Sequence, residues 1–254
     1  MQKYRVDLHI HTTLSPCGSL EMSPETIIRK AKEQNIDLIG ITDHNSMRQC
    51  NEIVALGKEN GLAVLKGVEI SSFEEVHCLA FFENDDEQNE FQKYLDEKLP
   101  NYPNHPLKFG DQVWVNRNNE IIGEEKRYLV SGLNASIGDI AAKIKEHNGI
   151  FIPAHIDRSM FSMTSQLGFI DATLPFDALE LSKNCDCRSF LNRHPVVKQY
   201  TVISSSDAHF PEMIGNSPSI FEMESLSFAE IKLALRGIDG RRAYPEKLNI
   251  RETE

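Results

Sequence analysis

The chain of 254 residues has a single tryptophan, only five cysteines and no long apolar run. Because a membrane-spanning helix needs about 20 apolar residues, we expect no membrane partner. An odd number of cysteines scattered through a chain of this length is not the pattern of a disulfide-bonded secreted protein. The N-terminal residues lead directly into an apolar strand, without the pattern of a signal peptide. These features predict a cytoplasmic protein.

Positive charge is also scarce, with 27 lysines and arginines against 38 acidic residues and a formal net charge of -11. This excess of negative charge disfavours non-specific binding to the phosphates of nucleic acids and of anionic membranes. We therefore expect no strong nucleic-acid binding, although bound divalent cations could create a local positive site.

Apolar strands and amphipathic helices alternate along most of the chain. Strands are predicted at residues 4–8, 37–41, 62–68, 76–82, 150–153, 177–181 and 201–204, with helices between most of them. Such alternation favours a parallel sheet with crossover helices. Residues 100–130 interrupt it with three prolines and a predicted small hairpin that carries Trp114. We interpret residues 1–254 as one domain, with residues 100–130 as an insertion within it.

The predicted strands share one feature, namely that metal-competent side chains lie at or close to their ends. These residues are His9, His11, Asp43, His44, Glu69, His77, His155, Asp207 and His209. A barrel brings the carboxyl ends of all its strands to one face, where active sites form. An open doubly wound sheet is the alternative, but it would concentrate its site at one switch point.

The side chains themselves favour a multinuclear metal centre. His9 and His11 are two positions apart on an extended chain, so both imidazoles point to the same side. Together with the other strand-end histidines, Glu69 and Asp207 they are too many for one tetrahedral ion. They suit two or three divalent transition-metal ions (zinc, iron or manganese), with Glu69 as the natural bridging carboxylate. Clustered ions of this kind promote hydrolysis at phosphorus through a metal-bound hydroxide.

The motifs together resemble the PHP (polymerase and histidinol phosphatase) domain family, and its stand-alone phosphoesterases in particular. The resemblance rests on residues 7–12 (DLHIHT), 41–45 (ITDHN), 67–70 (GVEI), 153–155 (PAH) and 206–209 (SDAH). It implies a distorted (β/α)7, TIM-like barrel with a site for two or three metals.

The resemblance also implies a distribution of metal ligands. His9, His11, Glu69 and Asp207 would hold one ion, Glu69, His77 and His155 a second, and His44 and His209 a third. Cys17 stands where several family members have a histidine or an acid. As a ligand of the third ion, its thiolate would favour zinc or iron; the alternative is a small residue beside a turn.

Three further residues could contribute to the reaction. Asp43 could orient a ligand or relay a proton, and with Glu69 and His209 it completes the predicted catalytic set. Arg158 and Lys183 follow strand ends and could bind a phosphate oxygen, although a surface salt bridge explains each equally well.

The function predicted from these observations is that of a metal-dependent phosphoesterase acting on a small phosphorylated molecule or nucleotide. One alternative is an amidohydrolase-type metal hydrolase, which usually has a bridging lysine where this chain has Glu69. The other is a non-catalytic PHP regulatory module, which should have lost metal ligands. The sequence does not specify the substrate or the oligomeric state.

Overall fold

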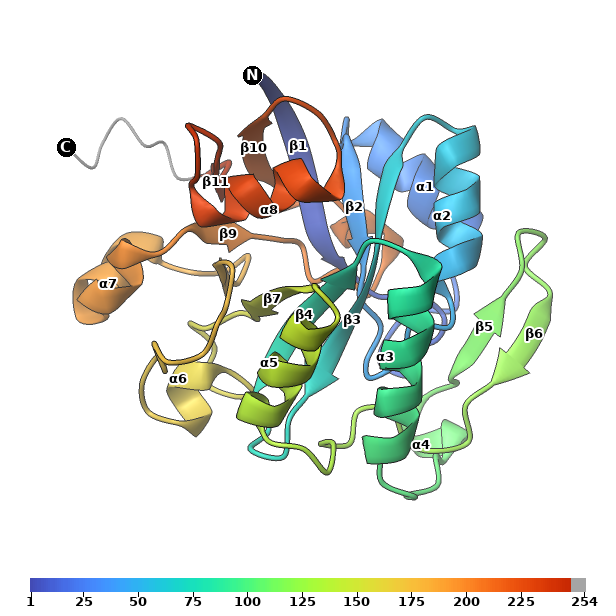
Figure 1. Ribbon diagram of the computed structural model, residues 1–254. Coiled ribbons are helices and arrows are strands. Elements are labelled where there is room, and N and C mark those ends of the chain that lie inside the picture. Colours follow the sequence, from blue (N-terminus) through green and yellow to red (C-terminus); the bar gives the residue numbers. More distant parts are fainter. Residues whose placement is uncertain (248–254) are drawn as a thin grey trace.

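The computed structural model describes residues 1–247, whose elements form a curled sheet with helices along its outer side (Figure 1). The strands are β1 (Gln2–Ile10), β2 (Leu38–Ile41), β3 (Ala63–Ser71), β4 (His77–Phe82), β5 (Val113–Val115), β6 (Ile121–Glu124), β7 (Ile150–Pro153), β8 (Leu179–Leu181), β9 (Val202–Ser204), β10 (Ser219–Met223) and β11 (Arg242–Pro245). The helices are α1 (Pro24–Glu33), α2 (Cys50–Glu59), α3 (Asp85–Lys98), α4 (Pro106–Phe109), α5 (Ile137–Glu146), α6 (Met163–Gln166), α7 (Cys187–Arg193) and α8 (Phe228–Arg236). Short 3-10 helices cover Pro195–Gln199 and Pro211–Met213.

Seven strands form the main sheet in the order β11-β10-β1-β2-β3-β4-β7. The central strands β1, β2 and β3 are parallel, whereas β4, β7, β10 and β11 pair antiparallel with their neighbours. Strands β8 and β9 form a separate parallel pair. Backbone hydrogen bonds connect the segments around this pair to the two sides of the curl. On one side Ile156 donates to Glu180 and Asp177 donates to Phe151; on the other Ala208 donates to His9 and His11 donates to Ala208. The predicted α/β class is confirmed, and the sheet is a curled half-barrel; the (β/α)7 barrel implied by the resemblance stays a prediction.

The regular alternation expected from the sequence differs from the structure at β3 and β4. Only residues 72–76 connect these strands. A parallel crossover needs a dozen or more residues, so the pair forms an antiparallel hairpin. Strands β10 and β11, at one end of the sheet, differ from the sequence analysis as well, which predicted no strand after residue 204. Helix α7 ends at Arg193 and a 3-10 helix begins at Pro195, because a proline cannot continue an α-helix.

Two buried apolar clusters hold the layers together. The larger one packs α1, α2, α3 and α5 against the sheet through side chains such as Ile27, Ile53, Phe91 and Ile140. The smaller one joins alternate strand residues to the buried face of α8. Among the described residues, no helix is long and apolar enough to cross a bilayer.

The β5–β6 hairpin stands at the edge of the molecule beside α2 and α3 (Figure 1). The side chain of Gln49 holds β5 by bonding both the N–H and the carbonyl of Val115. Trp114 packs against the larger core cluster, with the Arg48 guanidinium 5.6 Å from its ring. The treatment of residues 100–130 as an insertion in a single domain stays a prediction.

Candidate metal centre

Glu69, near the carboxyl end of β3, lies at the middle of a buried cluster of imidazoles. Its Oε1 is 2.9 Å from Nδ1 of His77 and 3.0 Å from Nε2 of His155. Its Oε2 is 3.0 Å from Nδ1 of His44. Glu69 is only 1% exposed, so these rings replace solvent around the carboxylate. The structure thus brings together four residues that the sequence placed at or near strand ends.

The His-x-His motif at the end of β1 forms the second part of the cluster. The Nε2 atoms of His9 and His11 are 3.2 Å apart. Oδ1 of Asp207 lies 3.6 Å from the first and 3.4 Å from the second, and each nitrogen has a Glu69 oxygen at 3.4 Å. The register of β1 against β2 shifts at this point, which is a common way to re-aim side chains beside a site.

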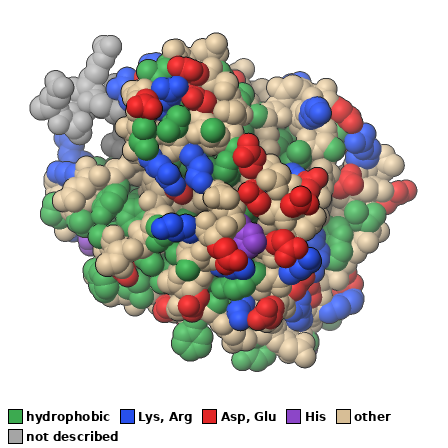
Figure 2. Space-filling model, viewed as in Figure 1, with side chains coloured by type: hydrophobic (Ala, Val, Ile, Leu, Met, Phe, Trp, Pro, Cys, Tyr) green, Lys and Arg blue, Asp and Glu red, His purple; other side chains and the backbone are tan. Residues whose placement is uncertain are grey.

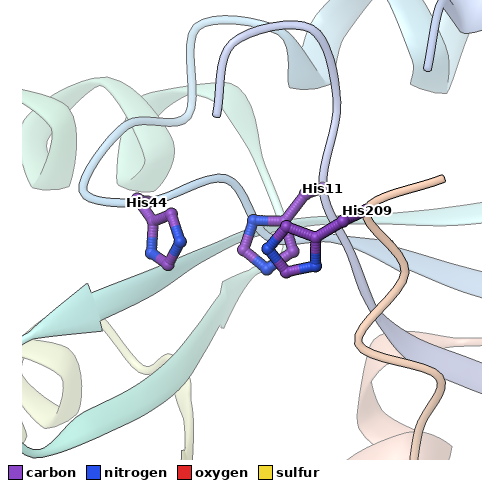
Figure 3. Close-up of side chains that lie close together, drawn as sticks. All are labelled: His11, His44 and His209. Carbon is purple, nitrogen blue, oxygen red and sulfur yellow. The ribbon is translucent and has the colours of Figure 1, made fainter. Parts of the chain in front are cut away.

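A third group lies toward the surface and consists of His11, His44 and His209 (Figure 3). One nitrogen from each ring lies within 4.8 Å of the other two. The rings of His11 and His209 stack with their centroids 4.1 Å apart. His11 therefore lies between the buried group around Glu69 and this outer group.

The thiol of Cys17 lies beside the outer group, although the residue as a whole is exposed. Burial of the sulfur opposes its ionisation, but the neighbouring His44 and His209 imidazoles favour it more strongly. They lower the pKa of Cys17 to about 6. Its place beside these rings is compatible with the predicted ligand role, which stays a prediction.

The donor set fits transition-metal ions. Two ligands of one tetrahedral zinc ion, each 2.0–2.1 Å from the metal, are about 3.3–3.4 Å apart. The separations of 3.2–3.6 Å among His9, His11, Glu69 and Asp207 lie around this value. Nδ1 of His44 is buried without a hydrogen bond among the described residues, even though Oε2 of Glu69 is 3.0 Å away. That nitrogen is therefore available to a metal ion.

The charges of the cluster also favour cations. Burial opposes protonation of His9, but Glu180, Glu69 and Asp207 outweigh it and raise the pKa of His9 well above its usual range. Burial would likewise raise the pKa of Glu69, yet His77 and His9 hold it well below its usual value. The pKa of Asp207 is also lowered, because His9 and His11 outweigh burial. Both carboxylates are therefore ionised in a buried place, where divalent cations would neutralise them.

Asp43, predicted as a catalytic residue, lies behind the histidines. Its carboxylate accepts hydrogen bonds from the N–H and hydroxyl of Thr12, each at 2.7 Å, and from the hydroxyl of Ser15 at 2.6 Å. Ser15 in turn is 2.9 Å from Nδ1 of His11. These contacts suit a residue that orients His11.

Sequence reasoning missed Glu180, which is in β8 and 2% exposed. Its Oε2 is 3.1 Å from Nδ1 of His9 and also accepts the backbone N–H of His155 at 3.1 Å. The available signal was a glutamate between two buried leucines, Leu179 and Leu181, in a strand that leads to the site.

A cavity of about 470 Å³ opens onto the cluster. Arg158 and Lys183 line it, and Nη1 of Arg158 is 3.0 Å from Oδ2 of Asp207. Their binding of a phosphate oxygen stays a prediction. Met160 and Phe161 add an apolar side to the same mouth. No residue of the β5–β6 hairpin lines this cavity, whereas Val113, Val115, Asn119 and Ile121 line a different one beside α1.

A buried centre of histidines and carboxylates at the strand ends of a curled α/β sheet is the arrangement of metal-dependent hydrolases. The chain belongs to the PHP domain family, whose sequence pattern matches residues 7–155. The resemblance drawn from the motifs is thereby confirmed.

Comparison with known proteins gives relatives of different kinds. The uncharacterized protein YqxK of Bacillus subtilis is 25% identical over 95% of this chain and 64% of its own length. The lesion-specific endonuclease PfuEndoQ of Pyrococcus furiosus has a similar fold, with a TM-score of 0.69 and 20% identity over 95% of this chain and 58% of its own. A putative metal-dependent phosphoesterase of Bifidobacterium adolescentis gives a TM-score of 0.55 and 19% identity, over 80% of this chain and 87% of its own. The chain spans less than two thirds of the first two proteins.

One comparison corrects the predicted partners. A structure of Endonuclease Q in complex with a 27-mer duplex, with an abasic lesion at the active site, matches 95% of this chain at a TM-score of 0.69. It contradicts the predictions of a small phosphorylated partner and of no strong nucleic-acid binding. The net charge of -11 does not exclude a nucleic-acid partner, because binding depends on the local field at one face and not on the sum over the surface.

Proposed function

We propose that this chain is a metal-dependent phosphodiesterase that cleaves nucleic acid. The observation that carries the proposal is a buried histidine–carboxylate cluster that opens into a cavity with Arg158 and Lys183 in its lining. The histidines and acids that would serve as ligands are all present, which favours an enzyme over a non-catalytic module. The duplex held by the structurally similar Endonuclease Q supports nucleic acid as the substrate class.

The residues of the cluster would bind different ions according to their position. His9, His11, Glu69 and Asp207 would hold one ion, and the remaining histidines, with Cys17, would complete the sites of one or two more. Divalent transition-metal ions bound there would supply a Lewis acid for the phosphoryl group and lower the pKa of a water molecule. Glu69 contacts three imidazoles at 2.9–3.0 Å and is the proposed bridge between sites.

The cavity rim would bind the phosphodiester. Arg158 and Lys183 can donate to non-bridging phosphate oxygens, and Arg158 would do so by exchanging its contact with Asp207 for the substrate. His209 lines the same cavity, and in an enzyme with two ions instead of three it would be free to donate a proton to the leaving oxygen. Asp43 would keep His11 oriented through Ser15.

The test is cleavage of labelled oligonucleotides by protein loaded with manganese or zinc. Single strands, duplexes and duplexes with an abasic position are compared on denaturing gels, with and without chelator. We expect metal-dependent cleavage of at least one form. Glu69→Gln should lower the rate by about 100-fold or more, since an amide cannot neutralise two ions. The control Glu97→Gln changes an exposed acid on α3 and should leave the rate unaltered. Metal-loaded protein that cleaves none of these oligonucleotides would refute the proposal.

A further inference from the structure

The loop that follows His155 presents apolar side chains at the mouth of a highly polar site. Met160 is 62% exposed and Phe161 is 36% exposed, and both line the cavity above the cluster. The ring of Phe161 stacks on the imidazole of His77, with centroids 4.9 Å apart and planes 17° from parallel. A flat aromatic surface therefore lies directly beside the proposed metal ligands.

The backbone holds this ring in place under strain. Phe161 has a φ of 60°, a left-handed conformation that residues with a Cβ adopt rarely. Its carbonyl accepts the N–H of His77 at 2.9 Å, which ties the loop to the start of β4. The loop is braced again by the hydroxyl of Ser162, which donates to the carbonyl of Arg158 at 2.6 Å. Backbone strain kept by such contacts is typical of functional positions.

We propose that Phe161 is a stacking platform for a nucleobase next to the phosphodiester that is cleaved. This inference rests on the proposed function and adds a residue that positions the substrate. Arg158 and Lys183 offer charge to the phosphate, while Phe161 and Met160 offer an apolar surface to the adjacent base. Stacking on an aromatic ring tolerates any base, so the contact would orient the nucleotide without reading its sequence.

The test compares oligonucleotides with and without bases. Binding of the metal-loaded protein is measured by fluorescence anisotropy with single-stranded phosphorothioate oligonucleotides, which resist hydrolysis. One oligonucleotide carries normal bases and its partner carries a central run of abasic residues. Wild type should bind the normal oligonucleotide about 10-fold more tightly than the abasic one. Phe161→Ala should bring this ratio close to one, whereas Phe161→Trp should preserve it.

Two further variants separate stacking from simple packing. Phe161→Leu keeps apolar bulk over His77 but removes the flat ring, so it should also lower the ratio. Phe73→Ala removes a more exposed aromatic, at 73% exposure, that does not line this cavity, and should leave the ratio unchanged. Metal content is measured for each variant to show that the cluster is intact.

The possible results have distinct meanings. A wild-type ratio near one, or a Phe161→Ala ratio equal to that of wild type, overturns the inference even if cleavage is normal. Base-dependent binding that requires Phe161, in a protein that cleaves no unmodified oligonucleotide, overturns the proposed function and supports the platform. Absence of both binding and cleavage overturns both.

Discussion

Replacement of Glu180 tests whether the metal centre depends on a residue that is not itself a proposed ligand. The carboxylate bonds Nδ1 of His9 and the backbone N–H of His155, each at 3.1 Å, and is 2% exposed. Partners of metal-binding histidines fix the tautomer and the ring orientation, and their loss typically weakens metal binding about 10–100-fold. Glu180→Gln keeps the shape and one acceptor oxygen but removes the charge, so we expect a loss of metal affinity within this range.

Glu180→Ala should add a loss of stability. Each hydrogen bond to a charged group contributes about 1.5–3 kcal/mol, and the variant leaves two buried N–H groups without this acceptor. We therefore expect the free energy of unfolding to fall by about 3–5 kcal/mol. Unfolding is measured in denaturant with chelator present, because bound metal would otherwise add its own stabilisation. Metal affinity is measured separately by competition with a chromogenic chelator.

Asp177 provides the matched control. It is a buried acid just before β8 that accepts the N–H of Phe151 at 2.9 Å and pairs with Arg236, away from the histidines. Asp177→Asn should lower stability but leave metal affinity unchanged. If Glu180→Gln binds metal as tightly as wild type, the contact with His9 has no positioning role and the reasoning fails.

Two further predictions concern the metal and the insertion. Purified protein should contain at least two equivalents of transition metal, and chelation should lower Tm by about 10 °C. The reason is that a metal concentration about 1,000 times Kd stabilises the folded state by about 4 kcal/mol. Protein with negligible metal, which added metal does not restore, would contradict this prediction. Arg127→Ala should cost about 1–2 kcal/mol near neutral pH, because Arg127 bonds Glu125 and the carbonyl of Asp96. Burial would raise the pKa of Glu125, but the contacts with Arg127 outweigh it and hold this pKa below its ordinary 4.5. The stability that the pair contributes is therefore present above pH 4.5 and is lost as the pH falls through the lowered pKa. The loss of unfolding free energy caused by Arg127→Ala, measured with denaturant, should thus become smaller in acid, and a loss that is independent of pH would contradict the assignment. As a control, Arg117→Ala, which breaks an exposed pair with Glu59, should cost less than about 0.5 kcal/mol.

The sequence by itself determined the family and the outline of the site. Each central strand is an apolar run followed by a polar side chain, and this pattern is local, so it can be read without knowing the fold. His9 and His11 had to share a side because they are two positions apart on a strand. The approach of Glu69 to His155 then followed from carboxyl ends of strands meeting at one edge. His77 joins them because the β3–β4 hairpin brings the start of β4 beside the end of β3.

Other features depended on contacts between segments far apart in the chain. Strand β8 has only three residues, too few to predict from their pattern which face of the strand carries Glu180. Its partner His9 is 171 positions away in the chain. The stacking of Phe161 on His77 depends on a left-handed backbone conformation at Phe161, which the neighbouring sequence does not predict.

The distribution of charge on the surface is a further feature that composition does not predict. Figure 2 shows acidic and basic side chains interspersed over α3, α5 and α8, so the net charge does not describe any one face. The cavity that combines Arg158 and Lys183 with an aromatic ring exists only once the loops after β7 and β8 are folded beside each other. Composition is a sum over residues, whereas binding is decided by the few side chains that the tertiary structure brings together.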